Sequence, residues 1–290
     1  MQLDIFEHSR GVMLRNDALQ ALQQRDPVAA RAAWRSLAAE YPRDPNLPSL
    51  EVLVAALEHV DNATFEHHAA AQTVLQHLQG SVQSEARRQL GDADGSAWMA
   101  PLWRHAAQRA SRLAFRPDCG DAHTAPLLLR AADFALAADA VATIPSWRRI
   151  PAALAWMAEA QIRLSGLDPS WGLLAELAWL SPGRFDALTR RLADPPLQRL
   201  LRQFDAAFEG DGSVDDLAWF PAWALTERPA LAVLIGQAQP GLHKPPEIAT
   251  RLLLDLLHLE RQGRQRELIE QRKSLRDLQP AIFAAYMRSR

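Results

Sequence analysis

This chain of 290 residues contains a single cysteine, Cys119, so it cannot form a disulfide within itself. One thiol excludes the disulfide-bonded scaffolds of small secreted proteins, and we therefore expect a cytoplasmic location. No apolar run is long enough to span a bilayer, so we expect no membrane insertion. The first fifteen residues also carry charges that the apolar core of a signal peptide lacks.

Lysine and tyrosine are scarce as well. Lys244 and Lys273 are the only lysines, and Tyr41 and Tyr286 are the only tyrosines, so arginine carries nearly all the positive charge. Arginine and tryptophan are favoured at contact surfaces, because they bury much area with little freedom to lose. A genome-wide preference for alanine, arginine, leucine, proline and tryptophan would give the same composition, and we favour that interpretation.

Strand-like alternation is nearly absent, whereas apolar residues recur at helical spacing along the whole chain. Proline, glycine or aspartate interrupts the pattern at short intervals, as at Asp26-Pro27, where aspartate can cap a helix that starts at proline. The sequence therefore predicts an all-α fold of stacked antiparallel helix hairpins without a significant β-sheet. We expect helices over residues 3–24 (or from residue 10), 27–41, 48–60, 64–78, 96–114, 124–141, 151–165, 169–180, 182–193, 195–209, 247–262 and 264–278, and a short helix after Pro280.

Two irregular segments, residues 91–95 and 115–123, mark possible subdomain joins. We expect an N-terminal helical-hairpin subdomain over residues 1–114 and a C-terminal helical-repeat subdomain over residues 124–290. One continuous array is the alternative.

Two segments, Asp17–Pro42 and Asp255–Pro280, share one residue spacing. It relates Ala30, Trp34, Leu37 and Pro42 to Leu268, Arg272, Leu275 and Pro280. Identical spacing of this kind is typical of helical repeats.

Both segments resemble tetratricopeptide-type helix hairpins. In the first, Ala30 stands where that family has a small residue and Trp34 where it has an aromatic one, whereas Leu268 and Arg272 replace them in the second. The resemblance implies a tetratricopeptide-like α-solenoid, in which each hairpin covers the apolar stripe of its neighbour. Trp34 would then be buried against the next hairpin.

Histidines and the lone cysteine offer the first chemical candidates. His59, His67 and His68 are possible metal ligands, but two helical turns separate His59 from the pair and no HExxH pattern is present. Cys119 and His123 share one loop, although spacing alone does not place a histidine within reach of the thiol. We interpret the histidines as surface residues and the loop as an ordinary turn.

Acidic and basic clusters also have plain structural interpretations. Asp215-Asp216 follows a glycine loop and can start a helix, since adjacent carboxyls do not face each other across a cleft. Arginines are frequent between residues 261 and 290, but glutamates lie three or four residues away from several of them. This spacing supports a helix, so we expect no nucleic-acid partner.

The tryptophans supply the favoured partner-binding site. Trp219 and Trp223 are one helical turn apart, and Trp171 and Trp179 are about two turns apart. An apolar stripe is most often core, but on the concave side of a solenoid it becomes a groove for a partner helix. We name Trp219, Phe220, Trp223, Trp171 and Trp179 as candidate partner-binding residues.

Two functions from different classes follow. We favour a non-catalytic scaffold without cofactor or bound metal, whose helical repeat surface binds a protein or peptide partner in a bacterial multi-protein assembly. The alternative is a metal-dependent or cysteine-dependent enzyme with a site assembled from distant residues, namely His59, His67, His68, Cys119 and His123.

Overall fold

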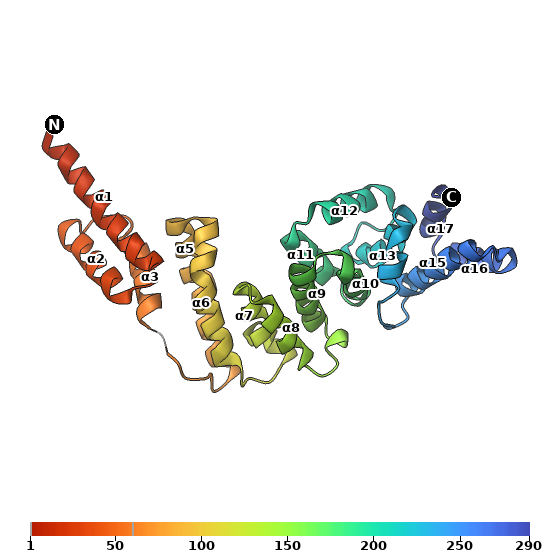
Figure 1. Cartoon of the computed structure of the whole chain (residues 1–290), viewed down its shortest axis with the longest axis horizontal. Coiled ribbons are helices and arrows are strands. Elements are labelled where there is room, and N and C mark those ends of the chain that lie inside the picture. Colours follow the sequence, from red (N-terminus) through yellow and green to blue (C-terminus); the bar gives the residue numbers. More distant parts are fainter. Residues whose placement is uncertain (1, 60) are drawn as a thin grey trace. The chain divides into compact units, whose positions relative to one another are not determined.

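The computed structural model describes the backbone of residues 2–59 and 61–290, and the side chains from residue 10 onward within those ranges. Over this part the chain is 79% helical, with 17 α-helices and no strand, and neighbouring helices pack against each other (Figure 1). The predicted all-α class is confirmed. The chain divides into two compact units, Met1–Asp133 (unit 1) and Phe134–Arg290 (unit 2).

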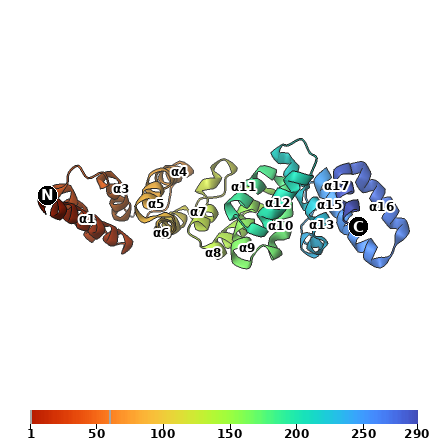
Figure 2. The ribbon, with the colours of Figure 1, turned by 90° about the horizontal axis from the view of Figure 1, so that it is seen from above.

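Unit 1 is built from helix pairs. Its helices are α1 (Gln2–Gln23), α2 (Pro27–Glu40), α3 (Leu47–Glu58), α4 (His68–His77), α5 (Gln83–Leu90), α6 (Asp92–Ala110) and α7 (Thr124–Arg130). The first two pack on each other, as do α5 and α6, and α4 reaches α5 through a π-helical turn. Figure 2 shows α4, α5 and α6 gathered together.

Side-chain hydrogen bonds start α2 and connect the first hairpin, α1 with α2, to α6. The Asp26 carboxylate accepts hydrogen bonds from the amides of Val28 and Ala29 at 3.0 and 2.9 Å, which caps α2 as the sequence predicted. The indole of Trp98 on α6 donates to the Leu22 carbonyl at 2.7 Å, and Arg25 donates to the Trp98 carbonyl at 2.6 Å. These two bonds tie the first hairpin to α6.

Unit 2 contains ten helices. They are α8 (Phe134–Ala142), α9 (Pro151–Ser165), α10 (Trp171–Leu180), α11 (Pro182–Leu192), α12 (Pro195–Ala207), α13 (Phe220–Glu227), α14 (Ala232–Ile235), α15 (Pro245–Gln262), α16 (Gln265–Leu278) and α17 (Pro280–Arg288). Five of them begin at a proline, which suits the first helical position because its missing N–H would have no partner there.

The core of unit 2 centres on the fully buried ring of Phe220. Its centroid lies 5.6 Å from that of Phe185, 5.7 Å from that of Phe204 and 6.2 Å from that of Trp171. Trp223, one turn along α13, lies 5.6 Å from Phe204. Helices α10, α11, α12 and α13 therefore meet at one aromatic cluster.

The structure departs from the expected helix over residues 124–141. This segment forms two helices, α7 and α8, and Ala132 between them has a positive φ of 60°. No glycine or proline stands at this break. The apolar periodicity therefore predicted one continuous helix. The division of the chain into units falls after Asp133, and α7 therefore belongs to unit 1.

The two segments with shared spacing both form helix hairpins, α1 with α2 and α15 with α16. Ala30, Leu37, Leu268 and Leu275 are all buried at the predicted packing positions. Trp34 is only partly buried, because its indole reaches across the surface to donate to the Leu47 carbonyl at 3.1 Å. Trp34 therefore contacts the start of the next helix, as expected, but is less buried than expected, and the tetratricopeptide resemblance stays a prediction.

Candidate functional site

Most of the predicted partner-binding tryptophan cluster lies in the core of unit 2. Phe220, Trp171, Trp223 and Trp179 are 0, 2, 2 and 5% exposed, and only Trp219 is partly exposed. Side chains buried to this extent offer little surface to a partner helix or peptide. An apolar stripe at helical spacing is usually core, and these four residues follow that rule.

The three candidate metal histidines are used locally instead. His59 contacts the Ala55 carbonyl at 3.0 Å, and His68 contacts the Ala114 carbonyl at 2.9 Å. His67 accepts from the Ala70 amide at 3.1 Å and so caps α4. Within the described residues, no group of three or more histidine, cysteine, aspartate or glutamate side chains is placed to hold a metal ion.

Cys119 and His123 lie in and next to a 3₁₀ turn, Pro117–Ala122. The Nδ1 atom of His123 accepts from the Ala125 amide at 3.2 Å, which caps α7, and its ring stands edge-on to Phe115. Burial lowers the pKa of His123 below its ordinary value. This histidine therefore has a structural task as the cap of a helix.

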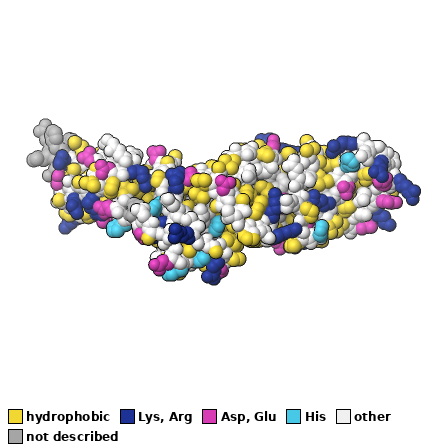
Figure 3. All heavy atoms as spheres, turned by 60° about the horizontal axis from the view of Figure 1, so that its bottom comes forward, with side chains coloured by type: hydrophobic (Ala, Val, Ile, Leu, Met, Phe, Trp, Pro, Cys, Tyr) yellow, Lys and Arg dark blue, Asp and Glu magenta, His cyan; other side chains and the backbone are white. Residues whose placement is uncertain are grey.

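Charged clusters pair within the fold. Asp216 accepts from the Gly212 amide at 2.8 Å, and Ser213 caps the turn that follows. Arg264 pairs with Glu267, and Arg272 and Arg290 both pair with Glu260. On the face drawn in Figure 3, basic and acidic side chains are interspersed. Among the described helices, none is both long and apolar enough to cross a membrane.

An open apolar groove of about 680 Å³ lies in unit 1 among α3, α4 and α6. Its apolar lining consists of Ala55, Ala56, Val74, Leu78, Pro101, Leu102 and Ala106. Four of these seven are alanine or proline, which allow another backbone to approach closely. The groove is large enough for several apolar side chains of a ligand.

The remaining lining of this groove is basic or neutral. It consists of Arg25, Arg109, Thr73 and three histidines, His59, His77 and His105. No aspartate or glutamate is among the described residues that line it. The groove thus combines an apolar floor with a rim of arginine and histidine side chains.

The two arginines of the rim are held in place. Arg109 donates to the Ala63 carbonyl at 2.7 Å and to Asp61 at 2.6 Å, and its guanidinium lies 4.2 Å from the centroid of the Phe65 ring. Arg25 bonds only a backbone carbonyl within the described part, and burial lowers its pKa. Arginine remains charged in proteins nonetheless, so Arg25 supplies a positive charge that no carboxylate neutralises.

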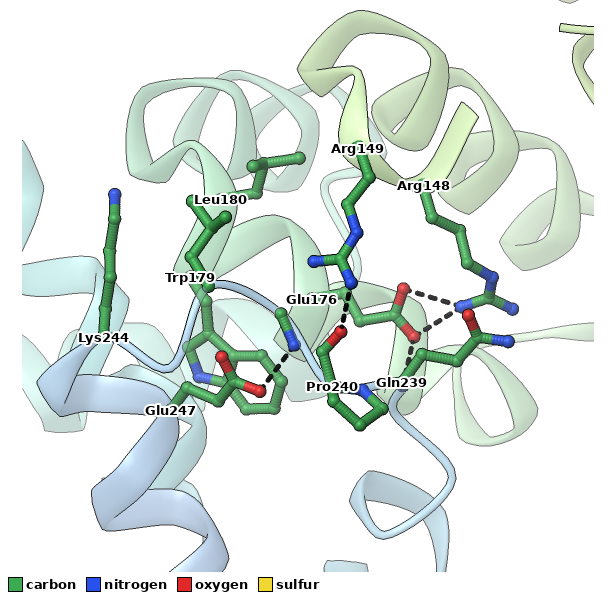
Figure 4. A pocket seen from close by; sticks show the side chains of 11 residues that line it. Arg148, Arg149, Glu176, Trp179, Leu180, Gln239, Pro240, Lys244 and Glu247 are labelled. Carbon is green, nitrogen blue, oxygen red and sulfur yellow. Dashed lines mark hydrogen bonds and ion pairs between the residues drawn. The ribbon is translucent and has the colours of Figure 1, made fainter. Parts of the chain in front are cut away.

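Unit 2 has a second, smaller pocket between α10 and the loop that precedes α15 (Figure 4). Two buried carboxylates hold this loop. Glu176 accepts from the Gln239 amide at 2.8 Å, and Glu247 accepts from the amides of Gly241 and His243 at 2.6 and 2.9 Å. A Cβ atom at Gly241 would lie 2.7 Å from Oε2 of Glu247, so glycine leaves room for the carboxylate beside its own amide.

Sequence reasoning missed both sites. His59, His77 and His105 are far apart in the chain, and each one alone resembles an ordinary surface histidine. The one sequence feature that indicates the groove is the alanine pair Ala55-Ala56, which lies near His59 at the end of a strongly apolar helix. Comparison of the chain with protein-family models, with curated proteins and with solved structures gave no match.

Proposed function

We propose that the protein is a non-catalytic interaction protein whose unit 1 groove binds an amphipathic helix of a partner protein. The observation that supports this most strongly is the open apolar floor of α3, α4 and α6, whose described lining includes no carboxylate, although Asp61 pairs with Arg109 beside it. Helix-in-groove recognition uses such a floor for the apolar face of the incoming helix.

The charge of the groove selects the occupant. Arg25 has no carboxylate partner in the described part of the chain, and three histidines stand on the same rim. A helix with acidic residues along the flanks of its apolar face would complement these groups, whereas a basic helix would be repelled. The partner segment is therefore an acidic amphipathic helix.

The experiment compares two fluorescent helical peptides that share one leucine pattern and carry either glutamate or lysine at the polar positions. Fluorescence anisotropy with the full chain measures the affinity of each. We expect saturable binding of the leucine–glutamate peptide and at least about tenfold weaker binding of the leucine–lysine peptide, because like charges at an interface cost several kcal/mol.

A matched pair of variants locates the binding. Ala56→Glu places a carboxylate in the groove, and Ala39→Glu places one on an exposed position of α2. Ala56→Glu should weaken binding of the leucine–glutamate peptide at least about tenfold, and Ala39→Glu should leave its affinity unchanged. Equal binding of both peptides, or equal affinity of both variants, would contradict the proposal.

A further inference from the structure

The pocket of unit 2 has the features of a built binding site. Its loop is fixed at Ala238 and Pro240 by arginines, since Arg251 and Arg149 each donate to one of these carbonyls at 2.8 Å. Together with the three amide bonds to Glu176 and Glu247, this makes five side-chain bonds to one short loop. Such rigidity is typical of a site whose geometry matters to a ligand.

The carboxylates of the pocket are already satisfied. Both oxygens of Glu176 contact Nη1 of Arg148, and Oε1 also accepts from the Gln239 amide. Each oxygen of Glu247 accepts a bond from a backbone amide. The two acids are 8 and 1% exposed, so they face protein donors and offer little to a ligand.

The donors of the pocket, in contrast, exceed its acceptors. Arg149 uses only Nη2, for the Pro240 carbonyl, and Lys244 is exposed and makes no side-chain bond within the described part. Trp179 lines the same pocket, and its buried indole N–H has no hydrogen-bond partner among the described residues. The pocket is lined by three cations, Arg148, Arg149 and Lys244, and by two carboxylates, Glu176 and Glu247. One net positive charge remains, so the site favours an anion.

The size and the walls of the pocket narrow the choice of anion. The cavity of about 30 Å³ has room for about two or three water molecules, which is the size of a carboxylate group. Arg149 presents a planar fork, which matches a planar carboxylate. Leu180 and Pro240, which Figure 4 labels, line the pocket together with Leu242 and supply its apolar wall.

We infer that this pocket binds an aliphatic carboxylate, with its head group on Arg149 and its carbon chain against Leu180 and Leu242, toward Lys244. The ligand is a free short-chain acid or the C-terminal carboxylate of a peptide, since both present the same chemistry. The inference is independent of the helix-binding groove in unit 1.

The two lysines of the chain provide the probe and its internal control. Reductive methylation of the chain with ¹³C-formaldehyde labels Lys244 in the pocket and Lys273, which is exposed on α16, together with the α-amino group. The variants Lys244→Gln and Lys273→Gln assign the two lysine signals. Isovalerate should shift the Lys244 signal saturably and leave the Lys273 signal in place.

Neutral and inorganic probes test the class of ligand. Isovaleramide has the same shape as isovalerate without its charge and should cause no shift of the Lys244 signal. Inorganic phosphate should bind at least about tenfold more weakly than isovalerate, because it has no carbon chain to contact the apolar wall. N-acetyl-leucine tests the peptide terminus against N-acetyl-leucinamide. If N-acetyl-leucine binds more tightly than isovalerate, the source is a peptide, and if it binds more weakly, the source is a free acid.

Arg149→Gln should weaken the binding of isovalerate at least about tenfold, because a charge-assisted hydrogen bond to the carboxylate is lost. Arg163→Gln, an exposed position on α9, is the matched control and should have no effect. Circular dichroism checks that both variants keep the helical content of the parent. No shift at Lys244, equal binding of isovaleramide or phosphate, or unchanged affinity in a folded Arg149→Gln variant would each overturn the inference.

Discussion

The two units use similar helices but treat their apolar surface differently. Unit 2 turns its aromatic side chains inward, so that rings from four helices meet at Phe220. Unit 1 leaves an open apolar groove among α3, α4 and α6, and arginines bind backbone carbonyls at its edges. Apolar surface that a fold leaves uncovered beside fixed positive charge is a candidate for contact with another molecule.

The largest effect should come from emptying the closed core of unit 2. Phe220→Ala should lower the free energy of unfolding by about 3 to 5 kcal/mol, because it leaves a cavity where four other rings now pack. Urea unfolding followed by circular dichroism measures the loss. Val233→Ala, at an exposed position of the same unit, should change the value by less than about 0.5 kcal/mol. A loss under about 1 kcal/mol for Phe220→Ala would remove the contrast between the units.

An intermediate effect is expected at the edge of the groove in unit 1. Arg25→Ala removes the bond to the Trp98 carbonyl and the guanidinium that lies 5.3 Å from the centroid of the Trp98 ring. We expect a loss of about 1.5 to 3 kcal/mol, the range for a hydrogen bond to a charged group. The exposed Arg35→Ala on α2 is the matched control. Equal stability of the two variants would show that the bond from Arg25 to α6 contributes nothing.

The smallest effect is a pH dependence in unit 1. Burial lowers the pKa of folded His123, so the unfolded chain takes up the proton first as the pH falls through about 6.5. Stability that is present above this pH is therefore lost as the pH falls toward the folded pKa, by at most about 1.4 kcal/mol per pH unit for one proton.

His123→Asn isolates this contribution, because asparagine can also cap α7 but does not titrate. Urea unfolding at pH 7.5 and 5.5 should show a smaller loss on acidification for the variant than for the parent chain. An equal loss in both would show that His123 does not carry the dependence.

Sequence periodicity located most helices but not the sites. Residues 151–165 and 182–193 were expected as helices, and α9 and α11 match them closely, because a proline starts each one and a short apolar repeat follows. The break at Ala132 was missed, since no glycine or proline marks the residue that takes the positive φ. Trp171 and Phe220 were assigned to a partner surface because spacing alone does not say which apolar stripe is buried.

The groove could not be read from the sequence for a related reason. His77 and His105 come from α4 and α6 and His59 directly follows α3, and only the packing of these helices brings the three to one rim. The pocket of unit 2 likewise depends on Glu176 and Glu247, which are distant in sequence and meet on one loop. A single sequence does not report such contacts.

Imidazole NMR signals test the helix-binding groove most directly. With the full chain labelled at histidine and assigned through His→Gln variants, addition of the leucine–glutamate peptide should shift the signals of His59, His77 and His105. The signals of His243 and His258 in unit 2 should stay in place. We predict saturable shifts confined to the signals of the three groove histidines. Binding of the peptide without any shift of these three signals would contradict the account.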